Sequence, residues 1–217
     1  FKKLNQFKIK NEMKQNILIQ KKIKFFSGSE TSNRKFLIIN ICREKLHYYE
    51  FVKPIEDILI DNNISYFVKH YKNLKKMDLG KANRIIICGT SLADNEFVED
   101  TNKFKWILNF DNSILGICGG MEIIGLIFEG KLKKKTEIGY YPENFKQEFL
   151  GLVEKQEVYH LHNYYIDFSK LKDFDVFCKS NGVVQAVKHK NKEIYGVLFH
   201  PEVRQKKLIK EFCGLKK

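Results

Sequence analysis

Several residue types are scarce in this 217-residue chain, and each scarcity excludes a class of protein. Only 3 residues are proline and 13 are glycine, while 43% are hydrophobic, which excludes collagen-like, low-complexity and largely disordered chains. No apolar run approaches the roughly 20 residues that a membrane-spanning helix needs, so we expect no membrane partner. The length is sufficient for one α/β domain with a sizeable core.

Cysteine is also sparse, and its spacing excludes two kinds of site. The five cysteines are odd in number and contain no Cys-x-x-Cys pair; they are Cys42, Cys88, Cys118, Cys178 and Cys213. This pattern fits neither a disulfide framework nor a structural zinc site, and it favours a reducing compartment. We therefore expect a cytoplasmic protein without metal or cofactor.

Arginine is scarce although the chain is basic. Only four of the 39 basic residues are arginine, the residue best suited to bidentate contacts with phosphate and bases. The net charge is +13, but residues 1–35 hold ten basic and two acidic residues and so account for +8 of it. The charge therefore does not predict a nucleic-acid-binding protein.

The composition divides the chain into two parts. Residues 1–34 are rich in Lys, Asn and Gln and end in the polar stretch Ser-Gly-Ser-Glu-Thr-Ser-Asn. We predict a flexible basic extension and linker there, with a targeting peptide as the alternative, although arginine is nearly absent. Residues 35–217 contain no internal repeat and no second linker, and we predict that they form a single domain.

From residue 35 onward, short apolar runs alternate with helical patterns. Strands are expected at 36–41, 64–68, 84–88 and 113–117, and helices at 49–60, 104–110 and 121–128. Further strands are expected at 131–138, 148–158, 164–168, 176–179, 183–188 and 193–199, before a last helix at 203–213. The alternation predicts βαβ units. The predicted fold is α/β and flavodoxin-like, with a three-layer open, mainly parallel sheet and an additional antiparallel strand region in the second half.

A candidate nucleophile stands where a predicted strand meets a predicted helix. Cys118 ends the strand and is followed by Gly119 and Gly120, which permit close approach by a substrate. Ligands of open α/β sheets bind at this edge, and the start of a helix favours a thiolate. The alternative is that Cys118 is a small buried residue and the glycines only permit the turn.

A histidine and a carboxylate follow another buried strand. His200 stands at the end of the predicted strand 193–199, and Glu202 lies two residues later, so the two side chains can point the same way. A thiol, an imidazole and an orienting carboxylate are the parts of a Cys-His-Glu triad. Taken alone, a histidine at a strand end is more often structural.

These segments resemble those of a known family. Gly-Ile-Cys-Gly-Gly-Met-Glu at 116–122 resembles the nucleophile motif of class I glutamine amidotransferases, and Gly-Val-Leu-Phe-His-Pro-Glu at 196–202 resembles their His-x-Glu motif. Residues 85–91 stand where the family has its oxyanion strand and turn. Motif order and spacing agree over about residues 35–215. Residues 186–197 are similar to free-standing amidotransferase subunits of GMP synthase, and Cys-Gly-Gly is also similar to the cobyric acid synthase branch.

The resemblance implies a reaction. Cys118 would attack the side-chain amide of glutamine, His200 would protonate the departing ammonia, and Glu202 would orient the imidazole. Backbone N–H groups of Thr90 and Gly119 would stabilise the oxyanion. The ammonia would pass to a separate synthase subunit, because 217 residues leave no room for a synthetase or ATP-binding segment.

Three positions depart from the family pattern. Glu122 replaces a glutamine that helps to bind the substrate, so an anionic carboxylate is expected in place of a neutral amide. Leu198 replaces a glutamine, and Thr90 replaces a glycine in a turn where a side chain would restrict a positive φ. These changes leave two alternatives open: a stand-alone γ-glutamyl hydrolase or peptidase, as Glu122 suggests, and a catalytically degenerate protein that only binds a partner.

The remaining histidines carry weaker signals. His160 and His162 alternate and can face one ligand, even a metal, but no third ligand clusters with them in the sequence. We therefore interpret His162 as a residue that lines the substrate cleft. His47, His70 and His189 lie in polar surroundings and are expected to be solvated.

Overall fold

The computed structural model describes residues 35–215, so the prediction of a flexible extension at 1–34 lies outside the described residues. The strands are β1 (Lys35–Asn40), β2 (Tyr66–His70), β3 (Ala82–Ile87), β4 (Ser113–Ile117), β5 (Lys131–Phe149), β6 (Leu152–Asp167), β7 (Phe174–Ser180), β8 (Val183–His189) and β9 (Ile194–Val197). The α-helices are α2 (Lys45–His47), α3 (Lys53–Asp61), α4 (Lys76–Gly80), α5 (Glu96–Glu99), α6 (Gly119–Ile127) and α7 (Lys206–Phe212). Within this range no helix is long and apolar enough to cross a membrane.

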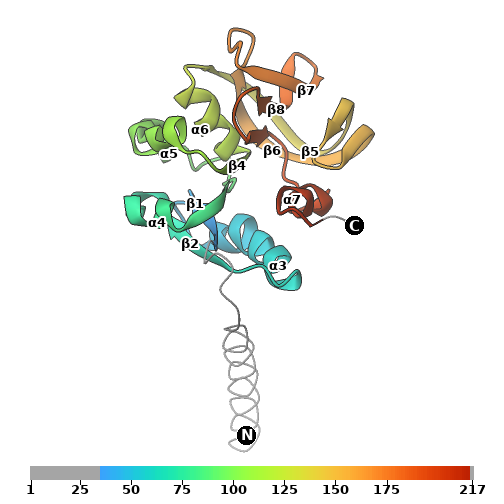
Figure 1. Cartoon of the computed structure of the whole chain (residues 1–217). Helices are drawn as coiled ribbons and strands as arrows, with labels where there is room; N and C mark the ends of the chain where they lie inside the picture. Colours follow the sequence, from blue (N-terminus) through green and yellow to red (C-terminus); the bar gives the residue numbers. More distant parts are fainter. Residues whose placement is uncertain (1–34, 216–217) are drawn as a thin grey trace, which may run out of the picture. The chain divides into compact units, whose positions relative to one another are not determined.

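The strands form a single sheet with two kinds of pairing. Its order is β2-β1-β3-β4-β9-β8-β7-β5-β6. The strands from β2 to β9 in this order are parallel, whereas β8, β7, β5 and β6 add antiparallel pairs. The mainly parallel α/β fold with an antiparallel region, predicted from the sequence, is therefore confirmed, and Figure 1 shows both regions.

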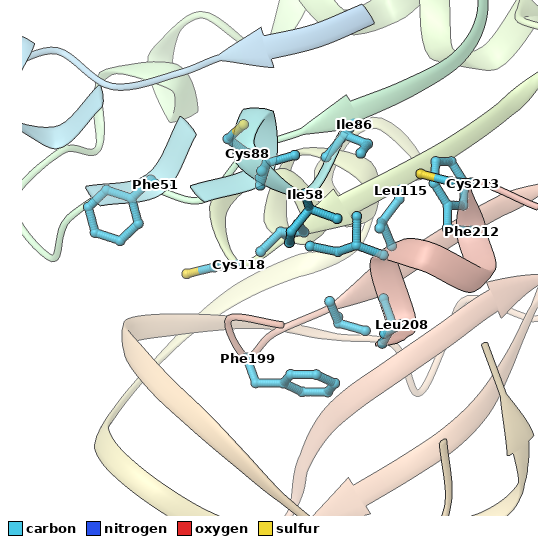
Figure 2. Close-up of a cluster of buried hydrophobic side chains, with 14 of the residues drawn as sticks. Phe51, Ile58, Ile86, Cys88, Leu115, Cys118, Phe199, Leu208, Phe212 and Cys213 are labelled. Carbon is cyan, nitrogen blue, oxygen red and sulfur yellow. The ribbon is translucent and has the colours of Figure 1, made fainter. Parts of the chain in front are cut away.

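Helices cover both faces of the parallel region because its strands are apolar on both sides. Phe36 and Ile38 of β1 share one buried cluster with α3 and α7, while Leu37 and Ile39 share the other with α6. In Figure 2, Leu208 and Phe212 of α7 lie in the first cluster. This packing gives the three layers that the alternating pattern predicted.

The first helical segment is longer than expected and contains a local distortion. The sequence predicted a helix over 49–60, but helical structure runs from α2 through a π-helical turn, η1 (Tyr48–Val52), into α3. Pro54 lies in the first turn of α3. Because proline has no N–H and disrupts a regular helical ladder, a wide turn just before it accommodates the residue without ending the helix.

Two other elements differ in detail from the prediction. The segment predicted as a helix at 104–110 is helical, but it is a 3-10 helix that begins earlier, η3 (Thr101–Asn109). The three strands predicted between 131 and 168 are two long ones, β5 and β6, which pair as a hairpin. Pro142 and the polar residues around it are not typical of a strand, so the sequence pattern did not predict the middle of β5. Proline is tolerated there because β5 pairs with β7 only at Phe145, within the described residues, so one edge needs no donor.

Candidate active site

The candidate catalytic residues stand at the carboxyl ends of neighbouring parallel strands. Cys118 follows β4, and His200 lies just beyond β9, which is the partner of β4. Thr90 follows β3, which pairs with the other edge of β4. The structure therefore brings three segments together at one edge of the sheet, although the first and the last are more than a hundred residues apart in the sequence.

Cys118 lies on a sharp strand-to-helix turn. Its backbone has φ 48° and ψ −109°, a conformation that is strained for a residue with a side chain, and the residue caps the N-terminus of α6. The turn also requires glycine two positions later, because a Cβ on Gly120 would lie 2.3 Å from the carbonyl oxygen of Ile87. The strand-to-helix turn predicted from Cys-Gly-Gly is therefore present, and it is called the elbow below.

His200 and Glu202 form a buried hydrogen-bonded pair. Nδ1 of His200 donates to Oε1 of Glu202 at 2.7 Å, and both side chains are fully buried. This bond leaves Nε2 of His200 without a hydrogen-bond partner among the described residues. The ring is further held by Phe51, whose centroid lies 5.3 Å away. The histidine is thus fixed in one orientation with one nitrogen free.

The thiol and the imidazole lie close together. A Cβ added to Gly89 would lie 2.5 Å from Cε1 of His200 and 3.2 Å from Cβ of Cys118. Because both atoms are close to this one position, the two side chains are close to each other. Burial raises the pKa of the Cys118 thiol, while the adjacent His200 opposes that effect. Burial lowers the pKa of His200, but the charges of Glu202 and Cys118 outweigh it and raise that pKa well above its usual value. His200 is therefore the group that can accept the thiol proton.

The other cysteines lack such a partner. All five are buried and free of disulfide bonds. Burial raises the pKa of Cys42 and of Cys213 to about 12, and it raises that of Cys88 well above the usual value. Of the cysteines in the described range, Cys118 is the one whose pKa a histidine lowers. It is accordingly the best candidate nucleophile.

The family model "Glutamine amidotransferase class-I" matches residues 47–213 of the chain. The chain belongs to this family. A subunit of the glutamine-hydrolysing GMP synthase of Methanosphaera stadtmanae is 32% identical over 157 residues, which cover 69% of this chain and 77% of that protein. The corresponding subunit from Methanobrevibacter smithii is 34% identical over 108 residues, which cover 47% of this chain and 56% of that protein. The match to the GMP synthase of Spiroplasma kunkelii covers only 20% of that protein.

Solved structures of the family share the fold. A protein from Thermoplasma acidophilum, described as one subunit of a GMP synthase, superposes with a TM-score of 0.75 at 21% identity, covering 86% of this chain and 95% of that one. A glutamine amidotransferase from Thermotoga maritima gives a TM-score of 0.63 at 18% identity, covering 85% and 84% of the two chains. The mainly parallel sheet and its antiparallel region are thus the class I amidotransferase fold.

One departure from the amidotransferase motif is milder than the sequence suggested. Glu122 lies in the first turn of α6 and lines a small cavity together with Cys118 and Gly119. Burial alone raises the pKa of its carboxyl to about 8. This pKa favours the protonated form at neutral pH, in which the group offers one O–H donor and a carbonyl acceptor, whereas a glutamine amide would offer two N–H donors.

The turn at Thr90 is held by residues that the sequence analysis missed. Thr90 does not have a positive φ, so its side chain causes no strain. Its hydroxyl donates to Oδ2 of Asp94 at 2.8 Å, and the same oxygen accepts from Nδ1 of His47 at 2.8 Å and from the Arg43 N–H at 3.0 Å. Burial opposes ionisation of Asp94, but these hydrogen bonds outweigh it and hold the pKa below its usual value. His47 is therefore not simply solvated, contrary to expectation.

The remaining predicted positions lie in different surroundings. His162 lines the same cavity as Cys118, as expected of a cleft residue. Leu198 is buried in the second apolar cluster. His189 is buried against Phe128 and Phe174, so the expectation that it is solvated was wrong. No local sequence signal distinguishes His189, because its burial depends on elements far away in the chain.

The structure places a third potential ligand beside the alternating histidines, which no local pattern in the sequence indicated. Glu137 stands opposite His162 in the β5–β6 hairpin. Nε2 of His162 lies 3.2 Å from Oε2 of Glu137, and His160 is next to them with its Nε2 3.3 Å from Oε1 of Glu143. All four side chains are buried.

Proposed function

We propose that the chain hydrolyses the side-chain amide of glutamine, with Cys118 as nucleophile, His200 as general acid and base, and Glu202 as the residue that orients His200. The observation that carries the proposal is the 2.7 Å bond from His200 to Glu202 beside a cysteine on a strained turn. Membership of the class I amidotransferase family supports it.

The steps follow from the placement of these groups. The Cys118 thiol transfers its proton to Nε2 of His200 as Sγ attacks the amide carbon, giving a tetrahedral oxyanion. The C–N bond then breaks, His200 protonates the departing ammonia, and a thioester remains. Water, deprotonated by His200, attacks the thioester, releases glutamate and restores the thiol.

The oxyanion is stabilised by backbone N–H groups of Thr90 and Gly119 in this proposal. Gly119 begins α6, and the first N–H groups of a helix have no acceptor within it. Thr90 lines the same cavity as Gly119, and its hydroxyl donates to Asp94, so its side chain already has an acceptor. Each donor of this kind is typically worth about 3 kcal/mol in the transition state.

The ammonia acceptor in this proposal is bound by a separate synthetase subunit of the GMP synthase type. The relatives from Methanosphaera stadtmanae and Methanobrevibacter smithii are each named as one subunit of a glutamine-hydrolysing GMP synthase. The name describes part of a larger enzyme, which supports a partner chain for this protein as well.

The test is an assay of ammonia and glutamate from glutamine, with and without a synthetase subunit, for the native chain and for Cys118→Ala. Cys213→Ala is the matched control, because that thiol is also buried but has no histidine beside it. We expect activity in the native chain and the control, and its loss in Cys118→Ala. The proposal is wrong if no ammonia forms even with the partner present.

A second candidate, a γ-glutamyl hydrolase, is favoured by Glu122, because a carboxyl group stands in the cavity where the family has an amide. The same catalytic residues would cleave a γ-glutamyl peptide. Assays with γ-glutamyl peptides beside glutamine distinguish the two, since faster release of glutamate from the peptides would replace the first proposal by the second.

A further inference from the structure

We propose that Glu137, His160 and His162 form a binding site for one zinc ion in the antiparallel region of the sheet, beside the candidate active site. The site goes beyond glutamine hydrolysis, and its test does not depend on that activity.

The hairpin places the three side chains on one face. His160 and His162 alternate on β6, and Glu137 on β5 is directly opposite His162. One nitrogen from each histidine and one oxygen of Glu137 lie within 4.8 Å of one another. Two atoms bound to the same zinc at about 2.0–2.1 Å each lie roughly 3.3 Å apart. Nε2 of His162 and Oε2 of Glu137, at 3.2 Å, already have that separation.

His160 has the arrangement of a zinc-binding histidine with an outer carboxylate. Its Nε2 lies 3.3 Å from Oε1 of Glu143, whose second oxygen accepts from the thiol of Cys178 at 3.5 Å. A histidine that donates one N–H to a carboxylate presents its other nitrogen as a ligand. Nδ1 of His160 is buried and has no hydrogen-bond partner among the described residues.

Buried polar atoms around the cluster lack hydrogen-bond partners. Nδ1 of His160, Nδ1 of His162 and Oε1 of Gln185 are buried and have no partner within residues 35–215. Zinc bound through Nε2 of His162 and Nδ1 of His160 would satisfy the His160 atom, and Gln185 already holds Oε2 of Glu137 through a 2.9 Å hydrogen bond from its Nε2. An unpaired buried polar atom is costly unless a ligand binds it.

The position of the cluster links it to the active site. Leu161 stands between the two histidines, and its carbonyl oxygen accepts a weak hydrogen bond from the Cys118 thiol at 3.6 Å. Zinc bound by His160 and His162 would fix this segment from both sides. We therefore expect the ion to stabilise the fold and to hold the wall of the cavity that faces Cys118.

The experiment uses the full chain without a purification tag, stripped of metal, in a Cys118→Ala background so that Cys118 and His200 cannot bind the ion themselves. Zinc is titrated in competition with a chromophoric chelator, and the thermal midpoint is recorded with and without zinc. We expect one zinc per chain and a higher midpoint. Glu137→Gln and His160→Gln should weaken binding by at least about a hundredfold, and Glu143→Gln by about ten- to a hundredfold.

His189→Gln is the matched control, because His189 is also buried but lies outside the cluster, and its affinity for zinc should not change. X-ray absorption at the zinc edge of the Cys118→Ala protein reads the ligands without any further substitution; we expect nitrogen and oxygen ligands with imidazole scattering. The proposal is overturned by the absence of stoichiometric binding, by sulfur ligation, or by equal affinity in the ligand variants and the control.

Discussion

The parallel and antiparallel regions of the sheet bury different kinds of side chain. In the parallel region, the central residues of β1 and β3 are fully buried and aliphatic; they are Leu37, Ile38, Ile39, Ile85, Ile86 and Ile87. The antiparallel region buries ionisable and amide groups; they are Glu137, Glu143, His160, His162 and Gln185. The sheet's own buried side chains therefore differ: those of β1 and β3 do not titrate, whereas the polar ones on β5, β6 and β8 form hydrogen bonds and charge pairs whose strength depends on pH.

The candidate active site lies where the two regions meet. Cys118 and His200 come from the ends of parallel strands, whereas Leu161 and His162, which line the cavity with Cys118, belong to the antiparallel hairpin. The backbone of the parallel region determines the positions of the reacting groups, and the hairpin lines the cavity beside them. The following predictions test this division.

The largest effect is expected when the carboxylate that orients the imidazole is changed. In Glu202→Gln the hydrogen bond to Nδ1 of His200 no longer selects the tautomer with a free Nε2, so kcat should fall by about 10³- to 10⁴-fold. The fold should remain, because the amide has the same shape. Glu157→Gln, an exposed carboxylate paired with Arg204, is the control and should keep full activity. A small loss in Glu202→Gln would show that the parallel strand ends alone orient His200.

The second prediction concerns packing in the parallel region. Gly120→Ala places a Cβ 2.3 Å from the Ile87 carbonyl oxygen, a backbone atom that cannot move without disturbing β3. We expect a loss of about 4 kcal/mol or more in the free energy of unfolding, measured by urea denaturation.

Gly80→Ala is the matched control, because a Cβ there has no atom within 4 Å and Gly80 lies in helix α4. It should be neutral or stabilise the protein by up to about 1 kcal/mol. Equal effects of the two substitutions would mean that the elbow beside Cys118 is not tightly packed.

The parallel region and its active-site loops were largely predictable from sequence, for a physical reason. Runs such as 36–41 and 113–117 are buried on both faces, so local hydrophobicity reports their position, and the residues that follow them must meet at one edge. That is why the positions of Cys118 and His200 could be predicted together although 81 residues separate them in the sequence.

The antiparallel region was less predictable. The middle of β5 contains Pro142 and alternating charges, so the hairpin was divided into three strands in the prediction. The pairing of Glu137 with His162 depends on register across that hairpin, which no local pattern reports. The raised pKa of Glu122 likewise depends on burial, which no local pattern reports.

The third prediction concerns Glu122, the buried carboxyl group in the first turn of α6. The pKa of Glu122 rises from 4.5 to about 8 on folding, so the native state holds a proton that the unfolded state releases. The free energy of unfolding should therefore fall as pH rises from 4.5 to about 8, by up to about 4 kcal/mol. Glu122→Gln removes this fall while keeping the shape of the side chain, and denaturation at several pH values measures the difference. An unchanged pH profile in the variant would show that the carboxyl is ionised in the native state.

The smallest effect is expected in the antiparallel region and has the opposite sign. The pKa of His162 falls from 6.5 to about 4 on folding, so within this range the unfolded state binds the additional proton. The free energy of unfolding should therefore decrease as pH falls from 6.5 to about 4, by about 2–3 kcal/mol. Measured with a chelator present, His162→Gln should lose this acid sensitivity, whereas His70→Gln, which alters a partly exposed histidine, should retain it. Parallel profiles of the native chain and His162→Gln would mean that acid destabilises the protein elsewhere, and the division of the sheet into a packed region and a titrating region would then be wrong.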